Sequence, residues 1–175
     1  PLHGPVWREN IGWFVDKYLK WGSYTPEEKG VLIAYGSIYG HTQQAAELLA
    51  DSLDEMGVSN IEMFDTSSTH PSYILSEAFR FSHLVFASAT YNNGLFDTMQ
   101  TLLHDISTHN LQNRTIAFIE NGSWAPVAGK LMKATLGNCK NNYLDQCVSF
   151  KSAVKEEQRA QIKELAKAIA ASLHA

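Results

Sequence analysis

The sequence has few of the features that mark secreted, membrane-bound or nucleic-acid-binding proteins. Its two cysteines, Cys139 and Cys147, form no CxxC pair and have no zinc-ligand spacing, so they favour a reducing compartment. The chain shows no segment of signal-peptide type and no apolar run of 18 residues, and we expect a cytoplasmic protein without a membrane partner. Basic side chains are outnumbered by acidic ones, 14 to 18, which argues against a nucleic-acid partner.

The acidic excess is confined to the middle of the chain. Residues 31–150 carry 5 basic and 11 acidic side chains, residues 1–30 are balanced, and residues 151–175 have a net charge of +2. A partner that is steered by charge should therefore be basic where it docks on this acidic body.

After residue 30, apolar runs of strand length alternate with helical patterns. Strands are expected at 31–35, 61–64, 84–87, 115–119 and 143–149, and helices at 41–56, 72–81, 95–107, 126–137 and 154–173. Strands that are apolar on both faces and alternate with helices indicate a parallel sheet that is covered on both sides. The pattern predicts an α/β, doubly wound, flavodoxin-like sheet of five parallel strands with helices on both faces, binding ligands at the carboxyl ends of the strands.

The first 30 residues have a different pattern. An amphipathic helix is expected over 7–21 from the helical spacing of Trp7, Ile11, Phe14, Val15 and Tyr18. Residues 22–30 are polar and contain Pro and Gly, which is typical of a linker. Because the chain starts at Pro1 rather than Met, we expect it to be part of a longer protein.

A loop suited to phosphate binding follows the first strand, with the sequence Gly36-Ser37-Ile38-Tyr39-Gly40-His41-Thr42. It runs directly into a helix, whose first N–H groups have no partner within the helix and can bind an anion without a cation. The loop is neither a GxGxxG motif nor a Walker motif and contains no Lys, which argues against a function in binding dinucleotides or nucleoside triphosphates. Taken alone, it could also be an ordinary turn with Ser37 or Thr42 as the N-cap.

Two more polar loops follow the third and fourth strands: Ser88-Ala89-Thr90-Tyr91-Asn92-Asn93-Gly94 and Glu120-Asn121-Gly122-Ser123-Trp124-Ala125-Pro126. Because the carboxyl ends of parallel strands share one edge of the sheet, we expect the three loops to converge. Together they suit a flat ring with polar edges, for which Tyr91 and Trp124 offer stacking faces. The alternatives are hydrophobic lid packing for Trp124 and a type I′ or related turn for Asn92-Asn93-Gly94.

These loops carry a resemblance to a known family. The stretch from Val31 to the C-terminus resembles a short-chain flavodoxin domain, in which a hydroxyl–x–aromatic-or-Thr–Gly–x–Thr loop binds the FMN phosphate; residues 37–42 match that pattern. Residues 90–96 and 120–124 more narrowly resemble the flavodoxin domain of flavodiiron proteins (A-type flavoproteins). The resemblance implies FMN as cofactor, held by Ser37, Ile38, Tyr39, Gly40, His41, Thr42, Ala89, Thr90, Tyr91, Asn92, Asn93, Gly94, Asn121, Gly122, Ser123, Trp124 and Ala125.

The N-terminus is similar to the same family. His3-Gly4-Pro5-Val6-Trp7-Arg8 resembles the end of the metallo-β-lactamase-like di-iron domain that precedes the flavodoxin domain, where the His before Gly-Pro is the last iron ligand. The resemblance assigns residues 1–30 to a remnant of that domain with a connector helix and linker, and residues 31–175 to the FMN-binding domain. One His cannot hold two irons, so we expect no metal in this chain and treat His3 as a solvated terminal residue.

The resemblance also implies a function in electron transfer. The parent would be an oxygen or nitric oxide reductase in which FMN receives electrons from rubredoxin or a reductase and passes them to the di-iron centre, in a head-to-tail homodimer. This chain would keep the flavin step and lose the reaction at the irons, and no catalytic residue is expected in it.

Two other functions stay open at this point. A stand-alone NAD(P)H-dependent flavin or quinone reductase shares the fold, although no nicotinamide site is evident in the chain. A receiver-type signalling module has a similar fold but needs an acidic Mg²⁺-binding cluster at the strand ends, where this chain has Ala34-Tyr35-Gly36. Structural roles are expected for His41, beside the phosphate, for Cys147, in the core of the fifth strand, and for Cys139, in an exposed loop.

Overall fold

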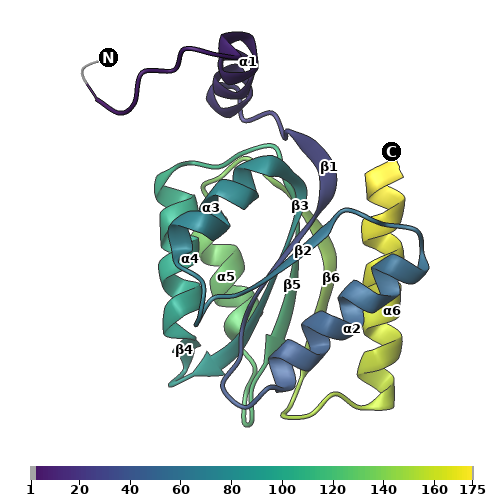
Figure 1. The fold of residues 1–175 in the computed structure, drawn as a ribbon. Coiled ribbons are helices and arrows are strands. Elements are labelled where there is room, and N and C mark those ends of the chain that lie inside the picture. Colours follow the sequence, from purple (N-terminus) through teal and green to yellow (C-terminus); the bar gives the residue numbers. More distant parts are fainter. Residues whose placement is uncertain (1–2, 175) are drawn as a thin grey trace.

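A parallel β-sheet runs through the protein, whose computed structural model describes residues 3–174 (Figure 1). The strands are ordered β2-β1-β3-β5-β6 and have the bounds β1 Glu28–Gly36, β2 Ile61–Asp65, β3 Phe81–Tyr91, β5 Thr115–Asn121 and β6 Asn142–Phe150. Each neighbouring pair is parallel, and a short strand, β4 (Gly94–Leu95), pairs antiparallel with the end of β3. The flavodoxin-like sheet of five parallel strands is therefore confirmed.

Helices cover both faces of the sheet, as predicted (Figure 1). On one face lie α2 (His41–Glu55) and α6 (Glu156–His174), and on the other lie α3 (Pro71–Arg80), α4 (Asp97–Thr108) and α5 (Ala128–Leu136). Successive side chains of a strand point to opposite faces, so in β1 Val31 and Ile33 join one core, while Leu32 and Ala34 join the other. Within residues 3–174, no helix combines the length and the apolar character needed to cross a membrane.

The strand order creates a crevice at the carboxyl ends of β1 and β3. The chain leaves β1 towards β2 on one side and then crosses to β3 on the other side, so the loops after β1 and β3 lead away from each other. Ligands of open α/β sheets bind at such a switch point. The fold therefore places the three polar loops at the edge where a ligand site is expected.

α1 (Ile11–Gly22) lies beyond the opposite, amino-terminal edge of the sheet (Figure 1). It starts at Ile11 and not at the predicted residue 7, because Asn10 has a left-handed φ of 49° that interrupts the helix. None of its residues is buried. Glu27 anchors α1 to the sheet: it accepts a hydrogen bond from Trp21 Nε1 at 2.6 Å and pairs with Lys17. The predicted linker is also shorter than expected, because β1 already begins at Glu28.

β3 is longer than the predicted residues 84–87 at both ends. At its end, residues 88–91 were predicted to lie in a loop but pair with β5 and β4. At its start, the polar side chains find partners. His83 is buried, with Nδ1 2.9 Å from Ser82 Oγ and Nε2 3.1 Å from Ser172 Oγ on α6. Burial, and to a smaller extent the charge of Lys29, lowers the pKa of His83 to about 4. His83 is therefore a neutral link between β3 and α6 at neutral pH.

This link predicts an acid-sensitive stability. Between the ordinary pKa of histidine, about 6.5, and the folded value of about 4, only the unfolded chain binds the proton, so stability falls as the pH falls through this window. We expect the free energy of unfolding to drop by about 2–3 kcal/mol on this account between about pH 7 and pH 4.5. The free energy of unfolding, measured by urea unfolding at several pH values, should depend less on pH in His83→Gln than in the wild type. An equal dependence on pH in both proteins would contradict the assignment.

Candidate functional site

The three predicted loops enclose a cavity of about 150 Å³ at the carboxyl ends of β1, β3 and β5. It is lined by Ser37, Ile38, Tyr39, His41, Thr42, Ala89, Thr90, Asn121, Gly122, Ser123 and Ser152. Ten of these eleven residues belong to the predicted set, and the structure brings them together around one space. Ser152 was not predicted. It follows β6 with a left-handed φ of 62°, and the sequence offered no motif around it.

The loop after β1 presents the uncapped start of α2 to this cavity. Gly40 occupies the N-cap position with a φ of 84°, and no side chain forms a cap there. The alternative of an ordinary turn capped by Ser37 or Thr42 is therefore wrong. Gly40 suits this place because a left-handed backbone is costly for residues with a Cβ. The first N–H groups of α2 are thus left for an anion, together with the positive end of the helix dipole.

Two buried side-chain atoms in the cavity have no hydrogen-bond partner. They are Ser37 Oγ and Asn121 Oδ1, and among the described residues no other buried side-chain nitrogen or oxygen atom lacks a partner. The other end of the Asn121 amide is engaged, because Nδ2 donates to Ser152 O at 3.1 Å and to Thr42 Oγ1 at 3.4 Å. Leaving a buried polar atom unpaired costs about 1–3 kcal/mol, so both atoms indicate a polar ligand.

The two unpaired atoms fit a phosphorylated polyol. Ser37 can donate its hydroxyl proton to a phosphate oxygen, next to the N–H groups of α2. Asn121 Oδ1 can accept from a hydroxyl of a ribityl chain. The residues present therefore fit the phosphate and polyol part of FMN.

The aromatic residues expected to hold the flavin ring lie outside the cavity. Tyr91 is 50% exposed and Trp124 is 90% exposed, so Trp124 does not form a packed lid. Gly40 and Ala125, which were also predicted, do not line the cavity either. The ring would therefore lie at the rim, between two aromatic side chains that have room to move against it.

Asn92 and Asn93 form a hairpin turn. Both have positive φ, 50° and 58°, and they connect Tyr91 of β3 to Gly94 of β4, which pair directly. Two central residues with positive φ are what a two-residue type I′ turn requires. Asn92-Asn93-Gly94 therefore forms the turn that was given as the alternative prediction, and these three residues do not line the cavity.

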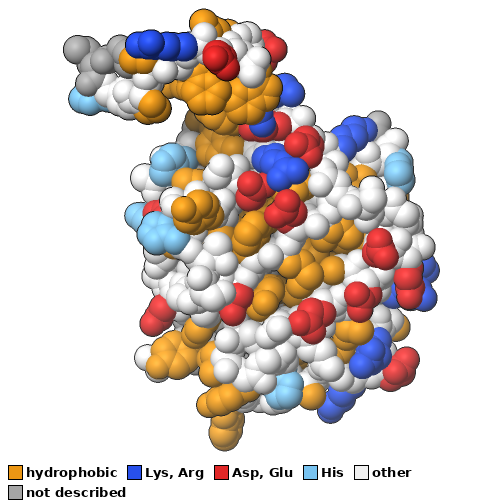
Figure 2. All heavy atoms as spheres, viewed as in Figure 1, with side chains coloured by type: hydrophobic (Ala, Val, Ile, Leu, Met, Phe, Trp, Pro, Cys, Tyr) orange, Lys and Arg blue, Asp and Glu red, His pale blue; other side chains and the backbone are white. Residues whose placement is uncertain are grey.

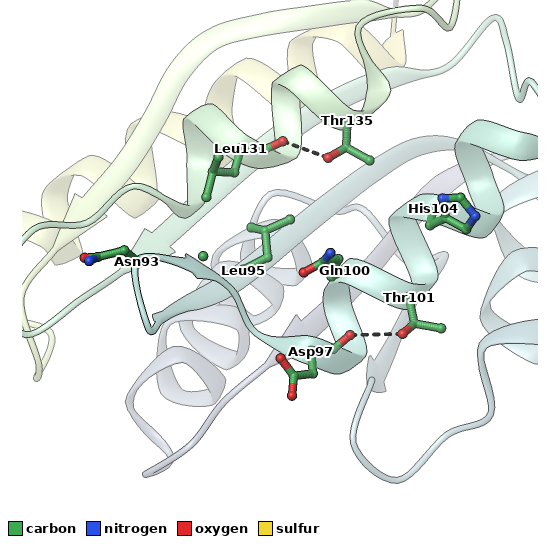
Figure 3. Close-up of a pocket in the computed structure, with 9 residues that line it drawn as sticks. Asn93, Leu95, Asp97, Gln100, Thr101, His104, Leu131 and Thr135 are labelled. Atoms are coloured by element: carbon green, nitrogen blue, oxygen red, sulfur yellow. Dashed lines mark hydrogen bonds between the residues drawn. The ribbon is translucent and has the colours of Figure 1, made fainter.

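A larger groove of about 660 Å³ lies next to this hairpin, between α4 and α5 (Figure 3). It is lined by Asn93, Gly94, Leu95, Asp97, Gln100, Thr101, His104, Leu131 and Thr135. The two hydrogen bonds drawn there, from Thr101 to Asp97 O and from Thr135 to Leu131 O, are each made within one helix. Neither unpaired buried atom lies in this groove, so the smaller cavity carries the stronger indication of a ligand.

The two cysteines are placed opposite to expectation. Cys139 is buried, because a tight turn after α5, with Cys139 N donating to Leu136 O, directs it inward. Cys147 is exposed, because β6 is an edge strand. Its sulfur nevertheless lies close to Gly129, and desolvation there, followed by the Glu120 charge, raises the pKa of the thiol to about 11. Burial also raises the pKa of Cys139, so both thiols are protonated at neutral pH.

His3 is exposed, and within residues 3–174 no three His, Cys, Asp or Glu side chains come together that could hold a metal ion.

Comparison with known proteins defines the class that this fold and site represent. The family model for flavodoxin matches residues 33–140, and the chain belongs to the flavodoxin family. Membership in this family implies FMN binding and a function in electron transfer.

The similarity extends, more distantly, to flavodiiron proteins. The chain is 27% identical over 172 residues to an uncharacterized protein of Methanocaldococcus jannaschii, covering 97% of this chain and 43% of the relative. It is 26% identical over 123 residues to the anaerobic nitric oxide reductase flavorubredoxin of Vibrio vulnificus, covering 70% of this chain and 25% of the relative. The chain therefore spans less than half the length of either relative.

Solved structures share the fold over different extents. Rubredoxin oxygen:oxidoreductase from Desulfovibrio gigas superposes with a TM-score of 0.86 at 24% identity, over 94% of this chain and 40% of that chain. A flavodoxin from Streptococcus pneumoniae superposes with a TM-score of 0.72 at 19% identity, over 83% of this chain and 99% of its own. The flavodoxin thus matches a smaller share of this chain than the oxidoreductase does.

Proposed function

We propose that this chain is the FMN-binding, electron-transfer part of a flavodiiron oxygen or nitric oxide reductase. The observation that carries the FMN site is the pair of unpartnered buried atoms, Ser37 Oγ and Asn121 Oδ1, beside the uncapped start of α2. The assignment to a flavodiiron protein is supported by the extent of the structural match. The Desulfovibrio gigas oxidoreductase covers 94% of the chain, whereas the Streptococcus pneumoniae flavodoxin covers 83%.

Each loop has a separate task in this proposal. Ser37 and the first N–H groups of α2 hold the phosphate, and Asn121 orients the polyol chain. Tyr91 and Trp124 flank the ring and leave its edge open to solvent, where a partner protein can reach it. When bound, FMN supplies the group that accepts and releases electrons.

The proposed donor is rubredoxin or a reductase, and the proposed acceptor is the di-iron domain of the parent protein in a head-to-tail homodimer. α1 and the residues before it support contact with such a domain, because they leave several large apolar side chains exposed (Figure 2). They are Val6, Trp7, Ile11, Trp13, Val15, Tyr18 and Leu19. Large exposed apolar patches on proteins mark sites of interaction with other molecules.

The donor assignment is tested with the FMN-loaded chain and reduced rubredoxin. The flavin absorbance should fall on mixing, and the chain should not oxidise NAD(P)H steadily in the presence of a quinone. Rapid NAD(P)H oxidation without an added reductase would instead favour a stand-alone flavin or quinone reductase.

Removing the Ser37 hydroxyl should weaken the binding of FMN but not that of riboflavin, which has no phosphate. A hydrogen bond to a charged group contributes about 1.5–3 kcal/mol, so Ser37→Ala should raise the Kd for FMN about tenfold or more. Titration of the cofactor-free chain with each flavin measures both values, and Ser68→Ala, on an exposed turn, is the control. An equal loss for both flavins would place the phosphate elsewhere.

The charge distribution predicts a low potential for the bound flavin. Among the described residues no Lys or Arg lines the cavity, and residues 31–150 carry 5 basic against 11 acidic side chains. This environment disfavours added negative charge, so the couple that yields the anionic reduced flavin should lie below that of free FMN. A potentiometric titration that places it above free FMN would contradict this prediction.

A further inference from the structure

The first turn of α5 is capped by side chains that come from two strands. Its N-cap residue, Val127, forms no side-chain cap. Thr90, near the end of β3, accepts hydrogen bonds at Oγ1 from Val127 N (3.1 Å) and Ala128 N (3.3 Å). Glu120, on β5, accepts a hydrogen bond at Oε2 from Gly129 N (2.7 Å). Three N–H groups at the start of α5 are therefore satisfied from the sheet.

These contacts hold the loop formed by residues 121–127 at its far end, while other contacts hold its beginning. At the beginning, Asn121 Nδ2 donates to Ser152 O and Gly122 N donates to Phe150 O at 3.1 Å. The loop also folds closely onto Thr90, since a Cβ on Gly122 would lie 3.2 Å from Thr90 Cβ. Between these fixed ends stands Trp124, the exposed aromatic side chain that is proposed to flank the flavin ring.

We propose that Thr90 and Glu120 are positioning residues that preset loop 121–127 for the flavin ring, an inference that rests on the proposed function. The Thr90 hydroxyl oxygen accepts two hydrogen bonds from the start of α5, so it is not free to accept from a ligand, although Thr90 also lines the cavity. The Glu120 carboxylate adds a favourable interaction with the positive end of the α5 dipole. A loop that is already ordered spares the flavin the entropy cost of ordering it on binding.

The capping is tested first without flavin, by hydrogen exchange on the cofactor-free chain. In Thr90→Val the amides of Val127 and Ala128 should exchange faster than in the wild type, and Thr90→Ser should restore their protection. Thr135→Val is a matched control, because Thr135 also lies on α5 and bonds within the helix to Leu131 O. If Thr90→Val does not fold, Glu120→Ala provides the same test at the Gly129 amide.

The presetting is then tested with two flavins. Thr90→Val should weaken FMN and riboflavin equally, by about tenfold, which corresponds to about 1.4 kcal/mol, because the loop faces the ring that both share. Thr90→Ser should bind both flavins nearly as the wild type does. Unchanged affinities in Thr90→Val, or a loss for FMN alone, would overturn the presetting role while leaving the FMN site intact. A wild-type chain that binds neither flavin would overturn the proposed function, whereas the exchange result would still report on the caps.

Discussion

Replacing Arg114 with Met is expected to lower the free energy of unfolding by about 3–5 kcal/mol. The guanidinium is fully buried and donates to the main-chain carbonyls of Tyr24 at 2.7 Å, Ala78 at 3.1 Å and Phe79 at 2.6 Å. Burial lowers its pKa to about 10, so it stays charged at neutral pH. Met fills a similar volume but donates no hydrogen bond, which leaves the carbonyls at the end of α3 and in the segment after α1 without a donor.

Two variants separate this effect from a general loss of charge. Arg114→Lys keeps the charge but cannot reach carbonyls on several sides with one ammonium group, so it should still be clearly destabilised. Arg159→Met, on the exposed face of α6, should change stability by less than about 0.5 kcal/mol. Urea unfolding measures all three, and an Arg114→Met variant within about 1 kcal/mol of the wild type would show that the carbonyls find other donors.

The second large effect is expected at Gly122, where valine should weaken FMN binding by at least about 100-fold. A Cβ at this position would lie 3.0 Å from Pro126 Cα, 3.1 Å from Pro126 N and 3.2 Å from Thr90 Cβ. Two of these contacts are with main-chain atoms, so the loop itself must move. The displaced loop would carry Trp124 away from the ring and disturb Asn121, which lines the cavity and has an unpaired Oδ1.

Gly137→Ala is the control for this substitution. A Cβ on Gly137 would meet only the carbonyl oxygens of Lys133 and Ala134, both at an ordinary 3.4 Å. This variant should bind FMN as the wild type does. If Gly122→Val binds FMN within about threefold of the wild type, the loop is not part of the site.

Much of the fold could be predicted because its signals are local. Val31, Leu32, Ile33 and Ala34 form an uninterrupted apolar run, which indicates a strand buried on both faces, and the structure buries all four completely. The ends of the elements were harder to predict. β3 continues through Ser82 and His83, whose polarity argues against a buried strand until Ser172, nearly 90 residues later, is seen to pair with His83.

The candidate site was predictable in the same local sense. The residues of the phosphate loop are adjacent in sequence, and the strand order brings the loops after β1, β3 and β5 to one edge. Ser152 and the caps on α5 could not be found in this way, because their partners are distant in sequence: Asn121 for Ser152, and Val127 for Thr90. The exposure of Cys147 depends likewise on β6 being the edge strand of the sheet, and the burial of Cys139 depends on the turn that follows α5.

The most direct test of the account is a titration of the purified, cofactor-free chain with FMN, followed by flavin fluorescence. We expect the signal to saturate at one FMN per chain with a Kd of about 1 µM or tighter, and riboflavin to bind more weakly because it leaves the start of α2 and Ser37 Oγ without a partner. A chain that shows no saturable binding of FMN, or binds riboflavin as tightly as FMN, would contradict the assignment of the cavity.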